Sequence, residues 1–141
     1  MPIVDASVVV ALVAPDAGDT ETDVRDLWRR WADGGVELWA PPLLKLEVLN
    51  ALLTALRGGR WEGAVADQAR ELVTTLPIGF QQTEADEHRA WELARRYDNW
   101  PVYDMVYLAL AARLGGPLVT LDDRLLRRFA HLDLVVAPGD A

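Results

Sequence analysis

The sequence predicts an α/β protein in which helices flank a central, mostly parallel sheet of four to five strands in a three-layer arrangement. Short apolar segments that suit buried strands alternate with longer segments whose apolar residues recur at helical spacing. Strands separated by helices imply parallel pairing through right-handed crossovers. The 141 residues show no repeat, linker or low-complexity tract, so we expect one domain over residues 1–141.

Turn and capping residues set the boundaries of the expected elements. Thr20-Glu21-Thr22-Asp23 and Thr83-Glu84-Ala85-Asp86 have the pattern of a capping box, and Pro41-Pro42 and Pro101 suit the first turn of a helix. Paired glycines end several helical segments. The expected strands are residues 2–5, 36–40, 77–80, 118–121 and 134–136. The expected helices are residues 6–13, 20–33, 41–56, 61–75, 83–97, 101–114 and 123–129.

Composition excludes several classes of protein. The chain has no cysteine, which rules out disulfides, thiolate zinc sites and cysteine nucleophiles and fits a reducing cytoplasm. A net charge of −8 speaks against a broad basic surface for nucleic acid, although cations bound by a nuclease would neutralise part of the acidic excess. The first apolar segment has no basic leader and is interrupted by Asp5, so we expect neither a signal peptide nor a membrane span.

Four acidic residues lie inside otherwise apolar stretches of the sequence. Asp5 and Asp122 each follow a buried strand, and their carboxylates should emerge at the carboxyl end of the sheet, where ligand sites form in open α/β folds. Asp104 is the only carboxylate of an apolar helix and lies in its first turn. Glu47 shares a narrow polar stripe with Asn50 beside a leucine-rich stripe. We expect the four acids to meet at one site.

Each acid also has a purely structural explanation. Asp5 and Asp122 fit the N-cap of a following helix, Asp104 fits the favourable end of a helix dipole, and Glu47 fits the edge of a buried helix. Asp123 competes with Asp122 for any functional role. An extended chain places Thr120 and Asp122 on the same side, so we favour Asp122.

The four acids together carry more information than any one of them. Two carboxylates about 5 Å apart repel each other by roughly 3 kcal/mol at an effective dielectric constant of 20. Several such pairs would rival the whole stability of a domain, about 5–15 kcal/mol, unless the cluster takes up protons or cations. Oxygen ligands without histidine or cysteine suit Mg²⁺ or Mn²⁺ rather than zinc.

Four short motifs carry a family resemblance. They are Ile3-Val4-Asp5-Ala6-Ser7, Leu46-Glu47-Val48-Leu49-Asn50-Ala51-Leu52, Tyr103-Asp104-Met105-Val106-Tyr107-Leu108-Ala109-Leu110-Ala111 and Leu118-Val119-Thr120-Leu121-Asp122-Asp123-Arg124-Leu125. In this order they resemble the successive motifs of PIN-domain ribonucleases, and most closely those of the VapC toxins of bacterial toxin–antitoxin pairs. The resemblance spans nearly the whole chain and implies the PIN-like form of the α/β fold.

The resemblance also implies a site and an activity. Asp5, Glu47, Asp104 and Asp122 would form a metal-binding quartet for Mg²⁺ or Mn²⁺, and the enzyme would cleave RNA. A metal-activated water would attack phosphorus in line, with Asp5 and Asp104 as the core ligands and the other two acids serving a second ion or the attacking water. Homodimers and inhibition by a cognate VapB-type antitoxin are implied as well.

Further polar residues are expected around this site. Ser7, Asn50 and Thr120 would orient the carboxylates. Three arginines follow the last acid and would supply contacts to RNA, although a solvated helix face explains them equally well. These arginines are Arg124, Arg127 and Arg128.

Other functions fit the sequence less well. Ser7 is the only serine and lacks a G-x-S-x-G elbow, which disfavours a hydrolase triad. A phosphoacceptor receiver domain needs paired acids at its first strand, and a haloacid-dehalogenase-type phosphatase needs a second aspartate after Asp5. A PIN-like protein that binds RNA or a partner without cutting RNA stays the main alternative. The six tryptophans suit either the core or an interface.

Overall fold

The computed structural model describes residues 1–15 and 19–141, with the backbone alone for residues 19–21. In this part of the chain the sheet has five parallel strands in the order β3-β2-β1-β4-β5. The strands are β1 (Ile3–Val4), β2 (Leu38–Ala40), β3 (Ile78–Phe80), β4 (Leu118–Val119) and β5 (Val135–Val136). The predicted α/β class and the parallel sheet are confirmed, although the strands are shorter than expected.

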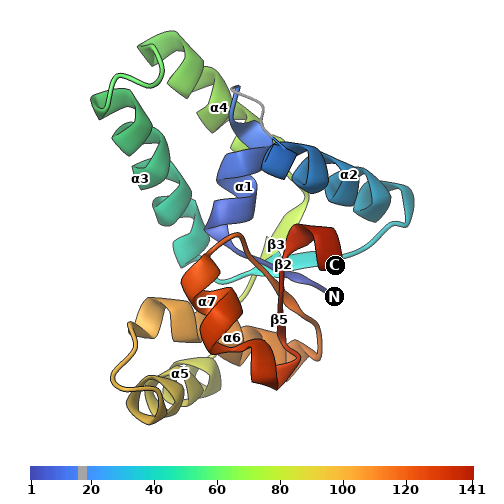
Figure 1. Ribbon diagram of the computed structural model, residues 1–141, viewed down its shortest axis with the longest axis vertical. Helices are drawn as coiled ribbons and strands as arrows, with labels where there is room; N and C mark the ends of the chain where they lie inside the picture. The colour runs from blue at the N-terminus through green and yellow to red at the C-terminus, as the bar shows by residue number, and fades with distance from the viewer. Residues whose placement is uncertain (16–18) are drawn as a thin grey trace.

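Helices cover both faces of the sheet (Figure 1). In that view α1 to α4 lie above the strands, whereas α5 and α6 lie below them. The helices are α1 (Ala6–Val13), α2 (Asp19–Asp33), α3 (Leu43–Arg57), α4 (Gly63–Thr75), α5 (Glu84–Arg96), α6 (Val102–Leu114) and α7 (Asp123–Arg128). Two 3-10 turns, η1 (Ala130–Leu132) and η2 (Pro138–Asp140), flank β5. None of the described helices is long and apolar enough to cross a membrane.

The strand order explains where a site can form. From β1 the chain adds β2 and β3 on one side, and it later adds β4 and β5 on the other side. The direction of winding therefore reverses between β1 and β4, and such a reversal leaves a crevice at the carboxyl ends of the two strands. Asp5 directly follows β1, and its backbone N–H donates to the carbonyl of Val119 in β4 over 3.0 Å. The crevice therefore opens beside Asp5.

Helix ends follow the capping residues in the sequence. The predicted capping box at the start of α5 is confirmed: the Asp86 N–H donates to the Thr83 hydroxyl over 3.1 Å, and the Thr83 N–H donates to the Asp86 carboxylate over 2.9 Å. Gly115 ends α6 with a φ of 70°, which glycine adopts without strain. The capping box predicted at residues 20–23 includes side chains that lie outside the described residues.

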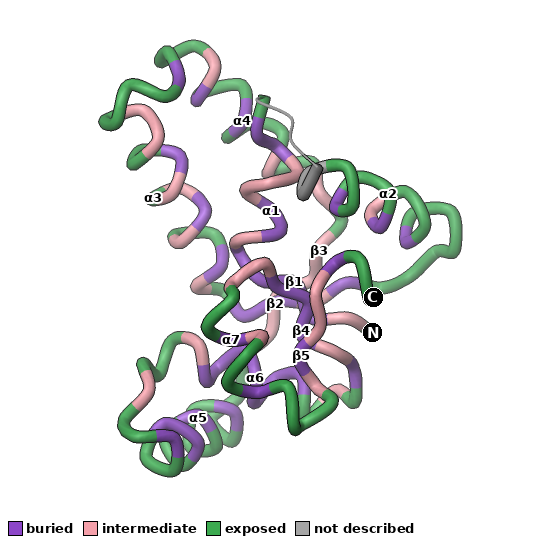
Figure 2. The backbone as a smooth tube through the Cα atoms, in the orientation of Figure 1, coloured by how far each residue is buried: buried purple, intermediate pink, exposed green. Residues whose placement is uncertain are grey.

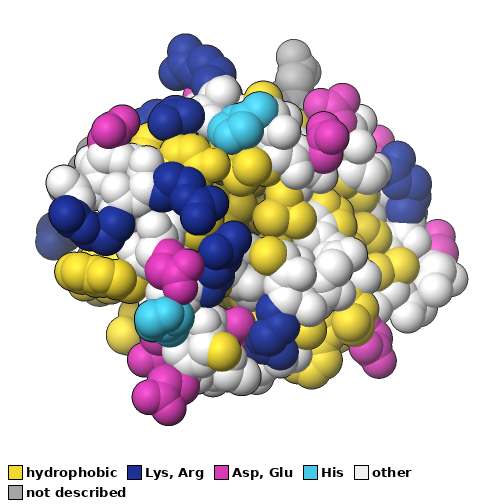
Figure 3. All heavy atoms as spheres, turned by 90° about the horizontal axis from the view of Figure 1, so that it is seen from below, with side chains coloured by type: hydrophobic (Ala, Val, Ile, Leu, Met, Phe, Trp, Pro, Cys, Tyr) yellow, Lys and Arg dark blue, Asp and Glu magenta, His cyan; other side chains and the backbone are white. Residues whose placement is uncertain are grey.

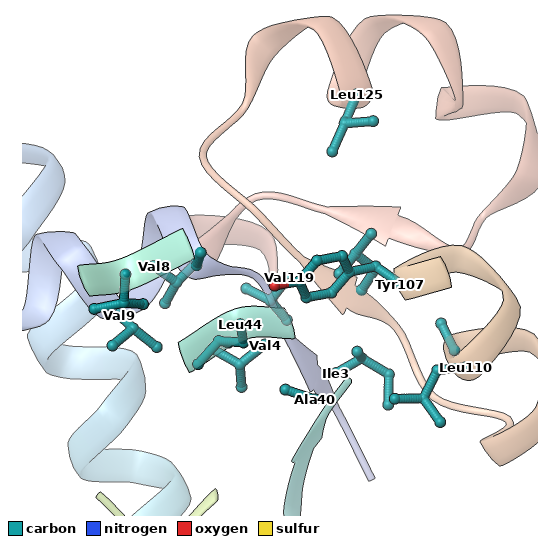
Figure 4. Close-up of a cluster of buried hydrophobic side chains, with 14 of the residues drawn as sticks. Ile3, Val4, Val8, Val9, Ala40, Leu44, Tyr107, Leu110, Val119 and Leu125 are labelled. Carbon is teal, nitrogen blue, oxygen red and sulfur yellow. The ribbon is translucent and has the colours of Figure 1, made fainter. Parts of the chain in front are cut away.

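The core centres on the strands and on α6, which is buried over residues 105–111 (Figure 2). Figure 4 shows how side chains from β1, α1, α3 and α6 meet there. The predicted apolar stripe of α3 faces this core, with Leu44, Val48 and Leu52 buried. Because α3 and α6 pack their apolar faces inward, any carboxylate at the border of those faces is held at a fixed place.

The tryptophans divide between the core and the surface. Trp28 and Trp31 of α2 pack edge to face with their ring centroids 5.8 Å apart, and Trp31 is buried. Trp91 of α5, in contrast, is 62% exposed. Trp100 is half-buried before α6 and packs against Phe129 at 5.3 Å. Trp28 and Trp31 of α2 thus pack as part of the core.

Candidate active site

All four predicted acids line one open cavity of about 430 Å³. They come from four different elements: Asp5 from the β1–α1 junction, Glu47 from α3, Asp104 from the first turn of α6, and Asp122 from the start of α7. The lining also includes Ala6, Ser7, Val10, Ala51 and Arg124. Four acids that are up to 117 positions apart in the sequence are thus brought together at the crevice between β1 and β4.

Asp5 is the most buried of the four acids and is 9% exposed. Its backbone has the extended conformation of an N-cap, but its side chain makes no capping hydrogen bond. The Ser7 hydroxyl instead donates to Oδ2 of Asp5 over 2.6 Å, and the Thr120 hydroxyl donates to the same oxygen over 2.8 Å. Capping therefore does not explain this carboxylate, and the structure places Ser7 and Thr120 against it.

Glu47 and Asp104 are half-buried, and each is held by an aromatic donor. The Tyr107 hydroxyl donates to Oε1 of Glu47 over 2.6 Å, and the Trp100 indole N–H donates to Oδ2 of Asp104 over 2.8 Å. Burial raises the pKa of both carboxyl groups, the aromatic donors oppose that rise, and the neighbouring Asp5 carboxylate adds to it. The pKa of buried Tyr107 is raised too, so its phenol stays protonated as a donor.

Asp122 differs from the other three acids. Its Oδ1 caps α7 by accepting the Arg124 backbone N–H over 2.9 Å, and the Arg124 guanidinium donates to Oδ2 over 2.9 Å. This hydrogen-bonded ion pair lowers the pKa of the Asp122 carboxyl group. The capping explanation therefore holds for Asp122. Asp123 is exposed in the first turn of α7 and does not line the cavity.

Three of the expected neighbours lie away from the cavity. Asn50 is exposed on α3 and is not part of the lining, so the expected contact between Asn50 and the carboxylates is absent. The helical period explains the difference, because Ala51, four residues after Glu47, occupies the lining position instead. Arg127 donates to the backbone of its own helix, and Arg128 lies over the Tyr97 ring at 4.8 Å. Only Arg124 of the three expected arginines reaches the site.

Trp100 and Tyr107 are parts of the site that the sequence interpretation missed. Tyr107 lies one helical turn after Asp104 in a helix that is otherwise apolar, and a buried tyrosine generally needs a partner for its hydroxyl. That signal identifies Tyr107 as a residue with a polar neighbour but does not identify Glu47. Trp100 precedes Pro101, outside the helical pattern, and carries no comparable signal.

The chemistry of the site suits a hard divalent cation. Its charged oxygens are carboxylates, and neither histidine nor cysteine lines the cavity. Among residues 1–15 and 19–141, no three acidic or histidine side chains lie close enough together to form a recognisable metal site. The donor set therefore fits Mg²⁺ or Mn²⁺ by its type, because Mg²⁺ usually keeps several water ligands and binds through one or two carboxylates.

Comparisons with known proteins identify the family of this chain. The PIN domain model matches residues 3–132. The chain is 30% identical to Ribonuclease VapC3 of Pyrobaculum aerophilum over 92% of its own length and 95% of that protein. It is 33% identical to Ribonuclease VapC3 of Mycobacterium tuberculosis, over 89% and 85% of the two chains.

A solved structure shares the fold as well. The crystal structure of VapC20 of Mycobacterium tuberculosis, described as a toxin that cleaves the sarcin–ricin loop, superposes with a TM-score of 0.65 at 18% identity. The match covers 91% of this chain and 95% of VapC20. The protein with this four-acid cavity therefore belongs to the PIN-domain family, among its VapC-type ribonucleases.

Proposed function

We propose that this protein is a divalent-metal-dependent endoribonuclease that acts in the cytoplasm as the toxin of a toxin–antitoxin pair. The observation that carries the proposal is the gathering of Asp5, Glu47, Asp104 and Asp122 in one cavity of a PIN-domain chain. The relatives named as VapC ribonucleases support RNA as the substrate. The whole chain would act as a single domain.

The cation would be Mg²⁺ or Mn²⁺, with Asp5 and Asp104 as its core ligands. When bound, such an ion lowers the pKa of a coordinated water and neutralises charge on a phosphodiester. Glu47 and Asp122 would serve a second ion or orient the attacking water. The Ser7 and Thr120 hydroxyls keep Asp5 in place, because both donate to one of its oxygens.

Arg124 would provide the contact to the RNA backbone. It lines the cavity, its side chain is 65% exposed, and its guanidinium has a planar set of donors that suits a phosphate. The face seen from below in Figure 3 mixes basic side chains with acidic and apolar ones and offers no continuous basic surface. The net charge of the whole chain is −8, so RNA binding would depend on a few contacts at the site.

A PIN-like protein that only binds RNA or a partner is the alternative. This alternative does not account for the free-energy cost of keeping several carboxylates close together. Glu47 and Asp104 are both half-buried with raised pKa values, and the Asp5 carboxylate contributes to both rises. A protein without cation-dependent chemistry would gain nothing from keeping these repelling groups together.

Partners of the toxin would bind to its exposed apolar surface. Leucines on α3 and α4 are unusually exposed, with Leu46 at 72%, Leu53 at 54% and Leu72 at 52%. A groove of about 390 Å³, lined by residues of α3, α4 and β3, lies beside them. We propose that a VapB-type antitoxin and a second copy of the chain use these surfaces.

The test combines metal binding, cleavage and toxicity. Purified protein should cleave RNA with Mg²⁺ or Mn²⁺ and not with a chelator, and the ions should raise its melting temperature. At an ion concentration of 100 times the dissociation constant, the stabilisation should be about 2.7 kcal/mol. Asp5→Asn should lose most of both effects, and expression of Asp104→Ala should no longer arrest bacterial growth.

Glu84→Gln is the matched control, since Glu84 is an exposed acid on α5 that lies outside the cavity. It should keep cleavage, toxicity and the response to metal. Cleavage that continues in the chelator, or an Asp5→Asn variant that behaves like Glu84→Gln, would refute the metal-dependent mechanism.

A further inference from the structure

Three of the four site acids share one hydrogen-bonding arrangement. In Asp5, Glu47 and Asp104, side-chain donors occupy one carboxylate oxygen: Oδ2, Oε1 and Oδ2, respectively. The described part of the chain offers no hydrogen-bond donor to the other oxygen of any of these three carboxylates. Each therefore has one oxygen fixed by the protein and one oxygen available to a ligand.

The donors to these three acids are all neutral. They are hydroxyl groups, a phenol and an indole N–H, which orient a carboxylate without cancelling its charge. Asp122 provides the contrast, because the positively charged Arg124 contacts both of its oxygens. Neutral donors preserve the negative charge that a cation requires.

The donors to Glu47 and Asp104 lie outside the cavity. Tyr107 is 1% exposed, and neither Tyr107 nor Trp100 is part of the cavity lining, whereas Glu47 and Asp104 are. Figure 4 shows the Tyr107 ring inside the apolar cluster near Val119, with its hydroxyl directed away from the α6 backbone. In Glu47 and Asp104 the oxygen opposite the fixed one is therefore left on the cavity side.

We propose that Tyr107 and Trp100 are positioning residues that present Glu47 and Asp104 to the divalent cation. This inference rests on the proposed metal-dependent function and extends it to two residues that touch neither cation nor RNA. Both donors belong to one segment, since Trp100 lies just before α6 and Tyr107 lies within it. The packing of this segment would thereby set the orientation of acids from two different helices.

Mn²⁺ affinity of the full-length protein tests the proposal directly. Isothermal titration calorimetry should show a Mn²⁺ dissociation constant about tenfold higher for Tyr107→Phe, which removes only the donating hydroxyl. Tyr103→Phe is the matched control, because Tyr103 lies one turn earlier on α6 and is 66% exposed. Its affinity should equal that of the wild type. Raising Mn²⁺ to saturation should restore RNA cleavage by Tyr107→Phe.

Two further variants keep the test decisive if Tyr107→Phe folds poorly. Trp100→Phe keeps an aromatic ring against Phe129 but loses the indole N–H, and it should also weaken Mn²⁺ binding about tenfold. Trp31→Phe, at a buried position of α2, is the control for the loss of indole volume. In a Glu47→Gln background, Tyr107→Phe should change Mn²⁺ affinity far less than it does alone.

The outcomes separate this inference from the proposed function. Wild-type protein that binds Mn²⁺, together with Tyr107→Phe and Trp100→Phe variants of unchanged affinity, would overturn the positioning role and leave the nuclease proposal standing. Wild-type protein that does not bind Mn²⁺ would overturn both. Equal losses in Tyr107→Phe and Tyr103→Phe would overturn the positioning role by showing a general effect on α6.

Discussion

The hydrogen bonds of Asp86 give a quantitative test of how the lower helical layer is held. Asp86 is 2% exposed on α5 and accepts three hydrogen bonds. Arg113 of α6 donates to it through Nε over 2.7 Å and through Nη2 over 2.9 Å, and the Thr83 N–H donates over 2.9 Å. Asp86 thus ties α5 to the helix that carries Asp104 and Tyr107.

Asp86→Asn keeps the shape of this side chain but removes its charge and turns one acceptor into a donor. Removing one partner of a buried ion pair costs about 3–5 kcal/mol, and loss of a helix cap costs about 0.5–2 kcal/mol. The Arg113 side chain is 33% exposed, so water can hydrate its guanidinium once the Asp86 charge is removed. We therefore expect a total loss of about 3 kcal/mol in the free energy of unfolding. For a chain of this length the melting temperature should fall by about 10 °C.

The effect should depend on pH with a defined sign. The hydrogen-bonded Arg113 holds the pKa of Asp86 below its ordinary value, although burial opposes this. The stabilisation is therefore complete above the unfolded pKa of about 3.9 and is lost as the pH falls through the lower folded value. Since Asn does not titrate, the stability difference between wild type and Asp86→Asn should shrink below about pH 4.

Urea denaturation of both proteins from pH 7 to pH 3 measures this difference. Glu84→Gln, which changes an exposed acid in the first turn of the same helix, is the control and should cost less than about 1 kcal/mol. A loss below about 1 kcal/mol for Asp86→Asn at pH 7, or a loss that stays constant down to pH 3, would refute the reasoning.

Three smaller predictions concern the sheet and the site. A Cβ at Gly79 would lie 2.6 Å from Cζ3 of Trp39, so Gly79→Ala should lower the free energy of unfolding in urea by about 1–3 kcal/mol. Thr120→Val removes a buried donor to Asp5 and should cost about 1–3 kcal/mol in the same assay, with slower RNA cleavage. Asp123→Asn should change stability by less than about 0.5 kcal/mol and leave cleavage intact; slower cleavage would transfer the role of the fourth acid to Asp123.

The sequence was sufficient to predict that the four acids lie close together in the fold. Carboxylates that follow buried strands, such as Asp5 and Asp122, can leave the apolar layer only at the strand ends. Parallel strands bring those ends to one edge of the sheet. The Asp5 and Glu47 carboxylates share a cavity because β1 lies at the winding reversal and α3 packs its leucine stripe inward. Local patterns and topology together determine which residues meet.

The hydrogen bonds inside the site could not be predicted in the same way. The contact between Tyr107 and Glu47 spans 60 positions and depends on how α3 and α6 pack, which no local pattern encodes. The alternatives for Asp5 and Asp122 looked alike in sequence, since both precede a helix. They differ in the structure, since two hydroxyls donate to Oδ2 of Asp5 and its side chain caps nothing, whereas Oδ1 of Asp122 accepts the Arg124 backbone N–H and caps α7.

The four acids also differ in how firmly the elements that carry them are held in the fold. Asp5 is tied to the central strands, and Glu47 and Asp104 lie on helices of 15 and 13 residues that pack against the core. Asp122 lies at the start of a helix of only 6 residues, where Arg124 contacts both of its oxygens. A short helix and an exposed ion pair cost little to rearrange. Asp5, Glu47 and Asp104 thus form the fixed part of the site, and Asp122 is the acid that can change partners when a cation competes for its carboxylate or an RNA phosphate competes for Arg124.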